Sequence, residues 1–305
     1  MIIDQKTPRS FAFSRYLEPI ASVSPGEEVT LFTEDAFLGR IRTEEDLPSQ
    51  VLGKYLNPQT GPLYIEGAKP GDILAIDIIR IDPGRDWAVS CMERNFGGLT
   101  GTELTRLLND PLPEKVWIYR FDDQGMLACD SNPRLRFPWD PFLGTIAAAP
   151  DMEVIKALTP FDQGGNMDVP DVKPGSRIFL PVKVEGGYVF TGDCHANQGE
   201  GELCGVALEI SARVTLRFSV IPDTPLSWPR IESPTECITV GSARPMEDAA
   251  RIAYAELITW MCEYGWDRYE AYQALTQAGR LSVGNMVDTV YSLAAKADKD
   301  LVMHP

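Results

Sequence analysis

The chain has 305 residues, of which 44% are hydrophobic and 24% charged, a composition typical of a soluble globular protein. Its formal net charge of −16 argues against a nucleic acid partner, because a phosphate backbone would be repelled. No apolar run approaches the roughly 18 residues of a membrane-spanning helix, so we expect no membrane partner.

The N-terminal stretch "MIIDQKTPRSFAFSRY" has no basic start followed by an apolar segment, so it does not resemble a secretory signal. Six cysteines occur without CxxC spacing, at positions 91, 129, 194, 204, 237 and 262. Free thiols in a reducing compartment explain this scatter better than a disulfide framework or a thiolate zinc site does. We therefore expect a cytoplasmic protein.

Residues 1–240 are predicted to form a β-rich catalytic region. From about residue 10 onwards, short apolar runs rich in Val, Ile and aromatic residues alternate with Gly and Pro, as in strands joined by turns. The stretch "LYIEGAKPGDILAIDIIRI" (63–81) predicts a hairpin-like pair of strands around a type II turn at 69–72. The same Pro-Gly device recurs at Gly26 and Gly175.

Residues 241–305 are predicted to be a helical segment packed on the same domain. "MEDAARIAYAELITWMCEY" (246–264) carries apolar residues at helical spacing and lies between a proline and a glycine. A second helix is expected from Asp267 and Glu270, which have the spacing of a capping box. "VGNMVDTVYSLAAKA" (283–297) predicts a third helix.

The stretch "TGDCHANQGEGELCG" (191–205) concentrates the reactive side chains of the β-rich region. If the strand before it continues, Asp193 and His195 share one face and Cys194 points to the other. A carboxylate beside an imidazole can hold a divalent metal with it, or can orient the imidazole. Both interpretations stay open on the local sequence.

Glycines in the second half of this stretch let the backbone approach a ligand closely. They would bring three more polar side chains into the same space: Gln198, Glu200 and Glu202. A second polar cluster, "GGNMDVPD" (164–171), has Asn166 and Asp168 at alternate positions. A turn with solvated polar residues explains this cluster locally. Hairpin-related strands could instead bring the ends of the two clusters to one rim.

Several familiar sites are excluded or unsupported. Two histidines cannot make a three-histidine zinc site, and no GxSxG elbow supports a Ser-His-Asp triad. Neither GxGxxG nor GxxxxGK[ST] is present, so nucleotide binding has no support. Cys194 could act as a nucleophile with a lysine and a glutamate, as in nitrilases, but we favour a buried inert thiol.

Taken in order, several stretches resemble the acetamidase/formamidase family. They are "TEDAFLGRI" (33–41), "NPQTGPLYIEGAKPGDILAIDI" (57–78), "PFLGTIAAAP" (141–150), "GGNMDVPDV" (164–172), "GSRIFLPVKVEGGYVFTGDCHANQGEGELCGVALE" (175–209) and the C-terminal "AARIAYAELITWM". The resemblance implies a mainly β (α+β) fold, a β-sandwich or double-layer architecture with C-terminal helices, and a homodimer. It also implies hydrolysis of short linear amides, such as formamide and acetamide, to a carboxylic acid and ammonia.

The resemblance further implies a divalent metal ion, with zinc as our prediction and calcium or manganese as alternatives. Its expected ligands are Asp168, Asp193 and His195, and a metal-activated water would attack the amide. The proton carrier is expected to be Glu202, with Glu66 as second choice and His195 as a further catalytic residue. The residues expected around substrate and metal are Asn166, Gln198, Gly164, Gly165, Gln163 and Glu200, with the Gly-Gly backbone as an oxyanion donor.

Three departures from the family pattern stand out. Gln163 occupies the place of a usual histidine, Cys194 that of a glycine, and Glu200 that of an aspartate. Because Gln163 removes a potential proton carrier, an alternative is a non-catalytic metal- or ligand-binding β protein on the same scaffold. Hydrolysis of another C–N bond, such as that of a lactam, and a cysteine hydrolase acting through Cys194 are further alternatives.

Overall fold

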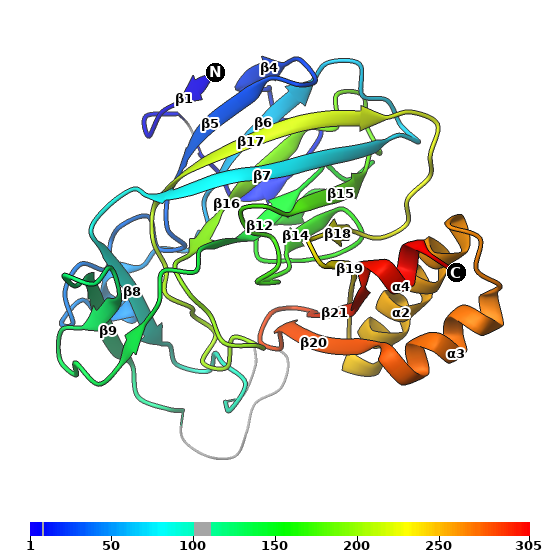
Figure 1. Cartoon of the computed structure of the whole chain (residues 1–305). Coiled ribbons are helices and arrows are strands. Elements are labelled where there is room, and N and C mark those ends of the chain that lie inside the picture. Colours follow the sequence, from blue (N-terminus) through cyan, green and yellow to red (C-terminus); the bar gives the residue numbers. More distant parts are fainter. Residues whose placement is uncertain (8, 101–110) are drawn as a thin grey trace.

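The structure is a computed structural model, and it describes residues 1–7, 9–100 and 111–305. Within these residues strands predominate, and three of the helices gather beside the C-terminal strands (Figure 1). The predicted mainly β fold with C-terminal helices is confirmed. No helix in the described part of the chain is long and apolar enough to cross a membrane.

The largest sheet crosses the whole molecule and has nine strands among the described residues. In spatial order they are β1 (Ile2–Ile3), β5 (Glu28–Thr33), β17 (Ala212–Ile221), β7 (Ile73–Pro83), β15 (Arg177–Pro181), β18 (Arg230–Glu232), β19 (Glu236–Ala243), β21 (Tyr291–Asp298) and β20 (Arg280–Asn285). Long strands β7 and β17 pair antiparallel within it; β7 is rich in Ile, and β17 contains Val, Leu, Phe and Ile.

A second sheet carries the polar motifs. Its strands are β14 (Gly164–Asn166), β12 (Phe142–Ala147), β16 (Val189–His195), β6 (Gln59–Ile65) and β2 (Arg9–Ser10), with β4 (Ala21–Val23) paired to β6. Two smaller sheets complete the β-structure: β11 (Arg136–Phe137), β10 (Leu127–Cys129), β9 (Lys115–Phe121) and β8 (Trp87–Met92) form one, and β13 (Ile155–Lys156) and β3 (Ala12–Phe13) the other.

The main hydrophobic core lies between the two large sheets. It joins Leu31, Ile76 and Leu216 of the nine-stranded sheet to Leu63 and Val189 of the second sheet. All five side chains are fully buried. The core therefore has the double-layer arrangement that the family resemblance implies.

The three Pro-Gly turns form as predicted, although none of them closes a hairpin. Gly26, Gly71 and Gly175 all have positive φ, the conformation that a type II turn requires at its third residue. The strands on either side of Gly71 are β6 and β7, which lie in different sheets. The hairpin-like pairing predicted for 63–81 is therefore wrong, because this turn passes the chain from one layer to the other.

The first two C-terminal helices agree with the sequence pattern. Helix α2 (Met246–Glu263) buries Ala253, Leu257 and Trp260 against β19 and β21, and α3 (Arg268–Ala278) follows it. The Asp267 side chain accepts hydrogen bonds from two backbone N–H groups of the first turn of α3, as its capping position predicts. The remaining helices are α1 (Pro48–Val51) and α4 (Lys299–Met303).

The third predicted helix, over 283–297, is wrong, because this segment forms most of the β20–β21 hairpin. Strand β21 pairs along its whole length with β19. Ala294 packs into the main core, whereas Ala295 and Ala297 pack on the helices, so apolar residues occupy both faces. A strand that is buried on both faces loses the polar alternation by which a strand is recognised, and its alanines then suggest a helix.

Candidate functional site

Strand β12 brings the two polar motifs of the second sheet together. It pairs with β14 on one side and β16 on the other, and Thr145 of β12 lies opposite Asn166. Asp193 and His195 end β16, while Asp168 follows β14. The two motifs therefore meet as predicted, but a strand between them joins them rather than a hairpin that pairs them directly.

A ring of carboxylates surrounds the His195 imidazole. Nε2 of His195 lies 3.5 Å from Oδ2 of Asp193, 3.9 Å from Oδ1 of Asp168 and 3.3 Å from Oε1 of Glu209. All four side chains are buried. The ligand atoms of Asp168, Asp193 and His195 lie within 4.8 Å of one another, close enough to hold a single metal ion together.

Gln198 fixes the orientation of His195. Its side-chain Nε2 donates to the backbone carbonyls of Asp168 and Gly284, both at 3.0 Å. These two acceptors settle which end of the amide is which, so its Oε1 faces Nδ1 of His195 at 2.7 Å. Nδ1 must then carry a proton and donate it, so that in the neutral imidazole Nε2 is left with its lone pair toward the carboxylates, as a metal ligand requires.

Burial makes these carboxylates difficult to ionise together. Burial, opposed in part by the charge of His195, raises the pKa of Asp168. Burial and then the charge of Asp168 raise the pKa of Glu202, and burial and then Asp193 raise that of Glu209. For Asp193 burial also opposes ionisation, but the charge of His195 and hydrogen bonds lower its pKa overall. A cation among these groups would relieve their mutual repulsion.

Two buried oxygens of this cluster lack hydrogen-bond donors among the described residues. They are Oδ1 of Asp168 and Oε2 of Glu209. Buried carboxylate oxygens in folded proteins normally accept hydrogen bonds, so two unpartnered oxygens beside the His195 imidazole indicate a missing partner. A donor set of one nitrogen and several carboxylate oxygens fits a divalent metal ion.

The backbone at the site is held in an unusual conformation. Asp168, Asp193 and Glu202 have φ values of 52°, 55° and 49°, in the left-handed region that non-glycine residues rarely adopt. A Cβ on Gly144 of β12 would lie 2.7 Å from Oδ1 of Asp168 and 2.9 Å from Oδ2 of Asp193. Only glycine leaves room there, so Gly144 contributes space to the site rather than a functional group. Strain of this kind concentrates at functional sites.

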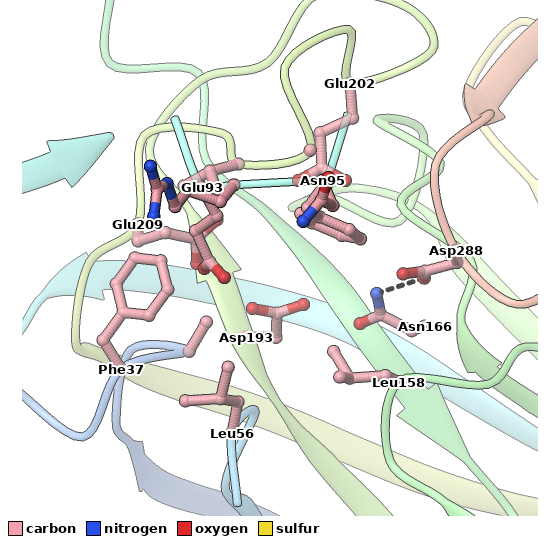
Figure 2. Close-up of a pocket in the computed structure, with 15 residues that line it drawn as sticks. Phe37, Leu56, Glu93, Asn95, Leu158, Asn166, Asp193, Glu202, Glu209 and Asp288 are labelled. Carbon is pink, nitrogen blue, oxygen red and sulfur yellow. Dashed lines mark hydrogen bonds between the residues drawn. The ribbon is translucent and has the colours of Figure 1, made fainter. Parts of the chain in front are cut away.

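A pocket of about 330 Å³ opens beside the cluster. Its polar wall is formed by Asn166, Asp193, Glu202, Glu209 and Asp288, and Figure 2 shows Asp193 at its centre. Burial raises the pKa of Asp288 to about 7. Asp168 and His195 do not line the pocket and lie behind this wall. A small ligand in the pocket would therefore face Asp193 and the two glutamates first.

Five further polar residues belong to the site and carry no sequence motif by themselves. Asn57 Nδ2 donates to Asn166 Oδ1 at 2.7 Å, Asn166 Nδ2 to Asp288 Oδ2 at 2.8 Å, and Asn285 Nδ2 to Asp168 Oδ2 at 3.0 Å. The residues that the sequence reasoning missed are Asn57, Thr145, Glu209, Asn285 and Asp288. The first three lie inside the stretches that resemble the family, so the resemblance could have identified them. The last two lie in the segment 283–297, which was predicted to be a helix away from the site.

Some of the predicted site residues lie apart from the cluster. Glu66 is exposed, and its carboxylate accepts hydrogen bonds from Ser24 and Ser22, which lower its pKa. Its position at the surface turn after β6 gives it no contact with the pocket. Glu200 is also exposed and does not line this pocket. Gln163 is fully buried, donates to the backbone of Gly164, and does not line the pocket.

The Gly-Gly pair has a packing role. A Cβ on Gly164 would lie 2.5 Å from the Ile146 carbonyl, and one on Gly165 2.6 Å from the Thr159 carbonyl. The N–H group of Gly164 donates to the carbonyl of Phe161. This group is therefore already bonded, which conflicts with the oxyanion role expected of it.

Cys194 points away from the pocket, as strand alternation predicts. Its side chain is fully buried in the core between the sheets. Burial raises the pKa of its thiol well above the ordinary value. A thiol that resists ionisation and does not face the pocket is unsuited to act as a nucleophile.

Comparison with known sequences gives consistent matches. The sequence profile described as the Acetamidase/Formamidase family matches residues 3–160 and 154–292. An acetamidase of Mycolicibacterium smegmatis is 27% identical, with 72% of this chain and 67% of the relative covered. A formamidase of Methylophilus methylotrophus is 26% identical, with 68% and 62% covered. The matched region thus spans about two thirds of these relatives' lengths.

Comparison with solved structures agrees with the sequence matches. A crystal structure of an acetamidase from Yersinia enterocolitica superposes with a TM-score of 0.93 and 43% identity. The superposition covers 97% of this chain and 90% of that one. The similarity therefore includes both sheets and the C-terminal helices.

Proposed function

The chain belongs to the acetamidase/formamidase family, and from this premise we propose that it hydrolyses short linear amides to a carboxylic acid and ammonia. The observation that carries the proposal is the buried group of Asp168, Asp193, His195 and Glu209 beside a pocket of about 330 Å³. Hydrolysis of an amide requires an activated carbonyl and a proton for the leaving nitrogen. Both can be supplied where acidic groups surround one imidazole.

We propose that Asp168, Asp193 and His195 hold a divalent metal ion, and we favour zinc over calcium or manganese. The unpartnered Oδ1 of Asp168, 3.9 Å from Nε2 of His195, supports a metal ion at this place. One nitrogen among carboxylates suits zinc, while more oxygen ligands would suit the harder ions. When bound, such an ion supplies Lewis acidity that polarises an amide carbonyl.

Glu202 is our proposed proton carrier. It lines the pocket, and burial and then the charge of Asp168 raise its pKa, so its carboxyl group holds a proton more readily than an exposed glutamate does. The nitrogen of the amide must gain a proton before it leaves as ammonia. A carboxyl group beside the pocket can supply this proton. Since Glu66 lies on the surface, Glu209 replaces it as the second candidate.

The test of this role is the Glu202→Gln variant. The amide keeps the size of the side chain but cannot carry the proton, so kcat for amide hydrolysis should fall by about 10²–10⁴-fold. The melting temperature and the metal content should stay close to those of the parent protein. Near-normal turnover would assign the proton to another group, with Glu209→Gln as the next variant to measure.

A non-catalytic metal- or ligand-binding protein on this scaffold is the alternative. It was favoured by Gln163 in place of a histidine, but Gln163 is buried outside the pocket lining. This alternative would be established if the protein binds zinc, releases no ammonia from any amide and opens no lactam ring.

We also propose a homodimer and a cytoplasmic location. The dimer is supported by the family resemblance alone. The location is supported by six cysteines that form no disulfide in the structure. Size-exclusion chromatography with light scattering tests the dimer, and fractionation of the source cells tests the location.

A further inference from the structure

The pocket has two walls of opposite character. The apolar wall is formed by Phe37, Leu56 and Leu158, with Ala36 and Phe96 beside them. In Figure 2 Leu56 and Leu158 lie on the side of Asp193 away from Glu93 and Glu202, and Phe37 lies to the left of Asp193, beside Glu209. A ligand whose reactive group faces Asp193 would thus place the rest of its body against carbon. Such a division is typical of sites that bind an apolar body by one polar end.

The size of the pocket exceeds what the smallest amides need. Its volume of about 330 Å³ lies at the lower end of the range, roughly 300–1,000 Å³, in which pockets bury most of a drug-sized ligand. One water molecule accounts for about 30 Å³ of liquid, so acetamide, with four non-hydrogen atoms, needs on the order of 100 Å³. Most of the volume beside the apolar wall would stay unfilled.

The apolar wall is fixed to the polar site through the backbone. Leu56 precedes Asn57, whose side chain bonds Asn166 and whose N–H donates to the carbonyl of Ala36 at 2.8 Å. This bond holds the loop of Phe37 beside that of Leu56. The loop of Leu158 packs directly on the second sheet. A Cβ on Gly165 of β14 would lie 2.6 Å from the carbonyl oxygen of Thr159, the residue after Leu158. The wall is therefore preformed rather than adaptable.

The charges of the lining bear on what the body of the ligand can be. Five acidic side chains line the pocket, namely Glu93, Asp193, Glu202, Glu209 and Asp288, against one basic side chain, the exposed Arg94. A carboxylate on the acyl chain of an amide would find a single basic side chain to pair with and would lose its hydration against the apolar wall, which disfavours it.

From this division we propose that the preferred substrates are primary amides with a bulky uncharged acyl group, seated on Phe37, Leu56 and Leu158, rather than formamide or acetamide. The inference rests on the proposed amidase function and specifies its substrate class. Each methylene that leaves water for the apolar wall should raise kcat/KM about four-fold. Butyramide should then exceed acetamide by roughly ten- to twenty-fold.

The first experiment measures ammonia release by the zinc-loaded protein from formamide, acetamide, butyramide, hexanamide and benzamide, with succinamic acid as the anionic counterpart of butyramide. A kcat/KM that rises with acyl size, and is at least about ten-fold lower for succinamic acid than for butyramide, supports the proposal. A maximum at formamide or acetamide overturns it and leaves the amidase function intact. No release from any amide overturns both.

The second experiment asks whether the apolar wall sets the preference. Leu158→Trp fills part of the pocket, so the ratio of kcat/KM for hexanamide to that for acetamide should fall by about ten-fold or more. The matched control is Leu281→Trp, a half-exposed position on β20 outside the pocket lining, which should keep the parent ratio. If Leu158→Trp does not fold, Leu158→Ala should lower the same ratio by removing the contact. An unchanged ratio in a folded variant overturns the assignment of the wall.

Discussion

At the scale of single residues, Gln198 holds the imidazole of His195 in place among the carboxylates of the site. Two backbone carbonyls fix its amide, and the amide in turn fixes the tautomer of His195. Such supporting contacts typically change metal affinity by 10–100-fold when they are removed. Gln198 therefore matters through the orientation of His195, without touching the pocket chemistry itself.

This role predicts a specific defect in Gln198→Leu. The variant keeps the bulk of the side chain but lets the imidazole turn, so zinc affinity should fall by about 10–100-fold, as measured by competition with a chelator. Asn197→Leu is the control, because its side chain bonds only the carbonyl of Pro138 on the surface. Equal zinc affinity in both variants would contradict the orienting role.

Asp288 predicts a pH dependence of stability in the metal-free protein. Burial raises its pKa from 3.8 to about 7, so between these values the folded protein keeps a proton that the unfolded chain has lost. The stability that this proton supplies is complete below about pH 4 and is lost as the pH rises through about 7. Asp288→Asn stays neutral, so its melting temperature in chelator should fall less between pH 4.5 and 7.5 than that of the parent.

The contribution of the neighbouring carboxylates remains in both proteins, because burial also raises the pKa values of Asp168, Glu202 and Glu209. The comparison of the two proteins isolates the part that belongs to Asp288. Parallel curves over the whole pH range would show that Asp288 is ionised in the folded protein at pH 4.5 and would refute the raised pKa.

The residues that sequence reasoning could find are those with a local rule. Strand alternation placed Asp193 and His195 together and Cys194 in the core, and the structure agrees. Glu209 and Asn57 have no such rule, because each joins the site through the pairing of distant strands. The oxyanion role expected around Gly164 conflicts with a bond of a different kind, a local turn in which its N–H donates to the carbonyl of Phe161, three residues before it.

At the scale of elements, β12 and the β20–β21 hairpin build the site. Strand β12 separates and aligns the two polar motifs, and the hairpin supplies Asn285 and Asp288. The sequence pattern predicted the strands, the Pro-Gly turns and helices α2 and α3. It could not separate a strand buried on both faces from a helix, and it could not tell that the turn at Gly71 changes sheets.

The contact between α2 and the C-terminal strands predicts a sensitive glycine. A Cβ on Gly241 of β19 would lie 2.2 Å from the carbonyl of Ala249 in α2. Gly241→Ala should therefore lower the free energy of unfolding by about 1–3 kcal/mol, because the helix and strand must move apart. Gly199→Ala is the control, as a Cβ there meets no atom within 4 Å, and its denaturant midpoint should stay unchanged.

Equal denaturant midpoints for Gly241→Ala and the parent protein would contradict the close packing of α2 on β19. A loss of zinc without a loss of stability would also be unexpected, since Gly241 lies away from the pocket lining.

At the scale of the whole molecule, segments far apart in the sequence meet at one pocket. Leu56 comes from the N-terminal part, Asp193 from the middle of the second sheet, and Asp288 from near the end of the chain. The hairpin with Asp288 belongs to the nine-stranded sheet, so the packing of the two sheets also assembles the site. Family resemblance supplied this architecture from the sequence; composition alone would have given only a mainly β globular protein.

The central claim is that this buried acidic cluster hydrolyses amides with the help of a divalent metal ion. The most direct measurement is ammonia release from the amide panel by protein stripped with chelator, verified as metal-free by mass spectrometry, and then reloaded with zinc. We predict loss of turnover on stripping, recovery on reloading, and no recovery in Asp193→Asn. Full turnover by verified metal-free protein would contradict the account.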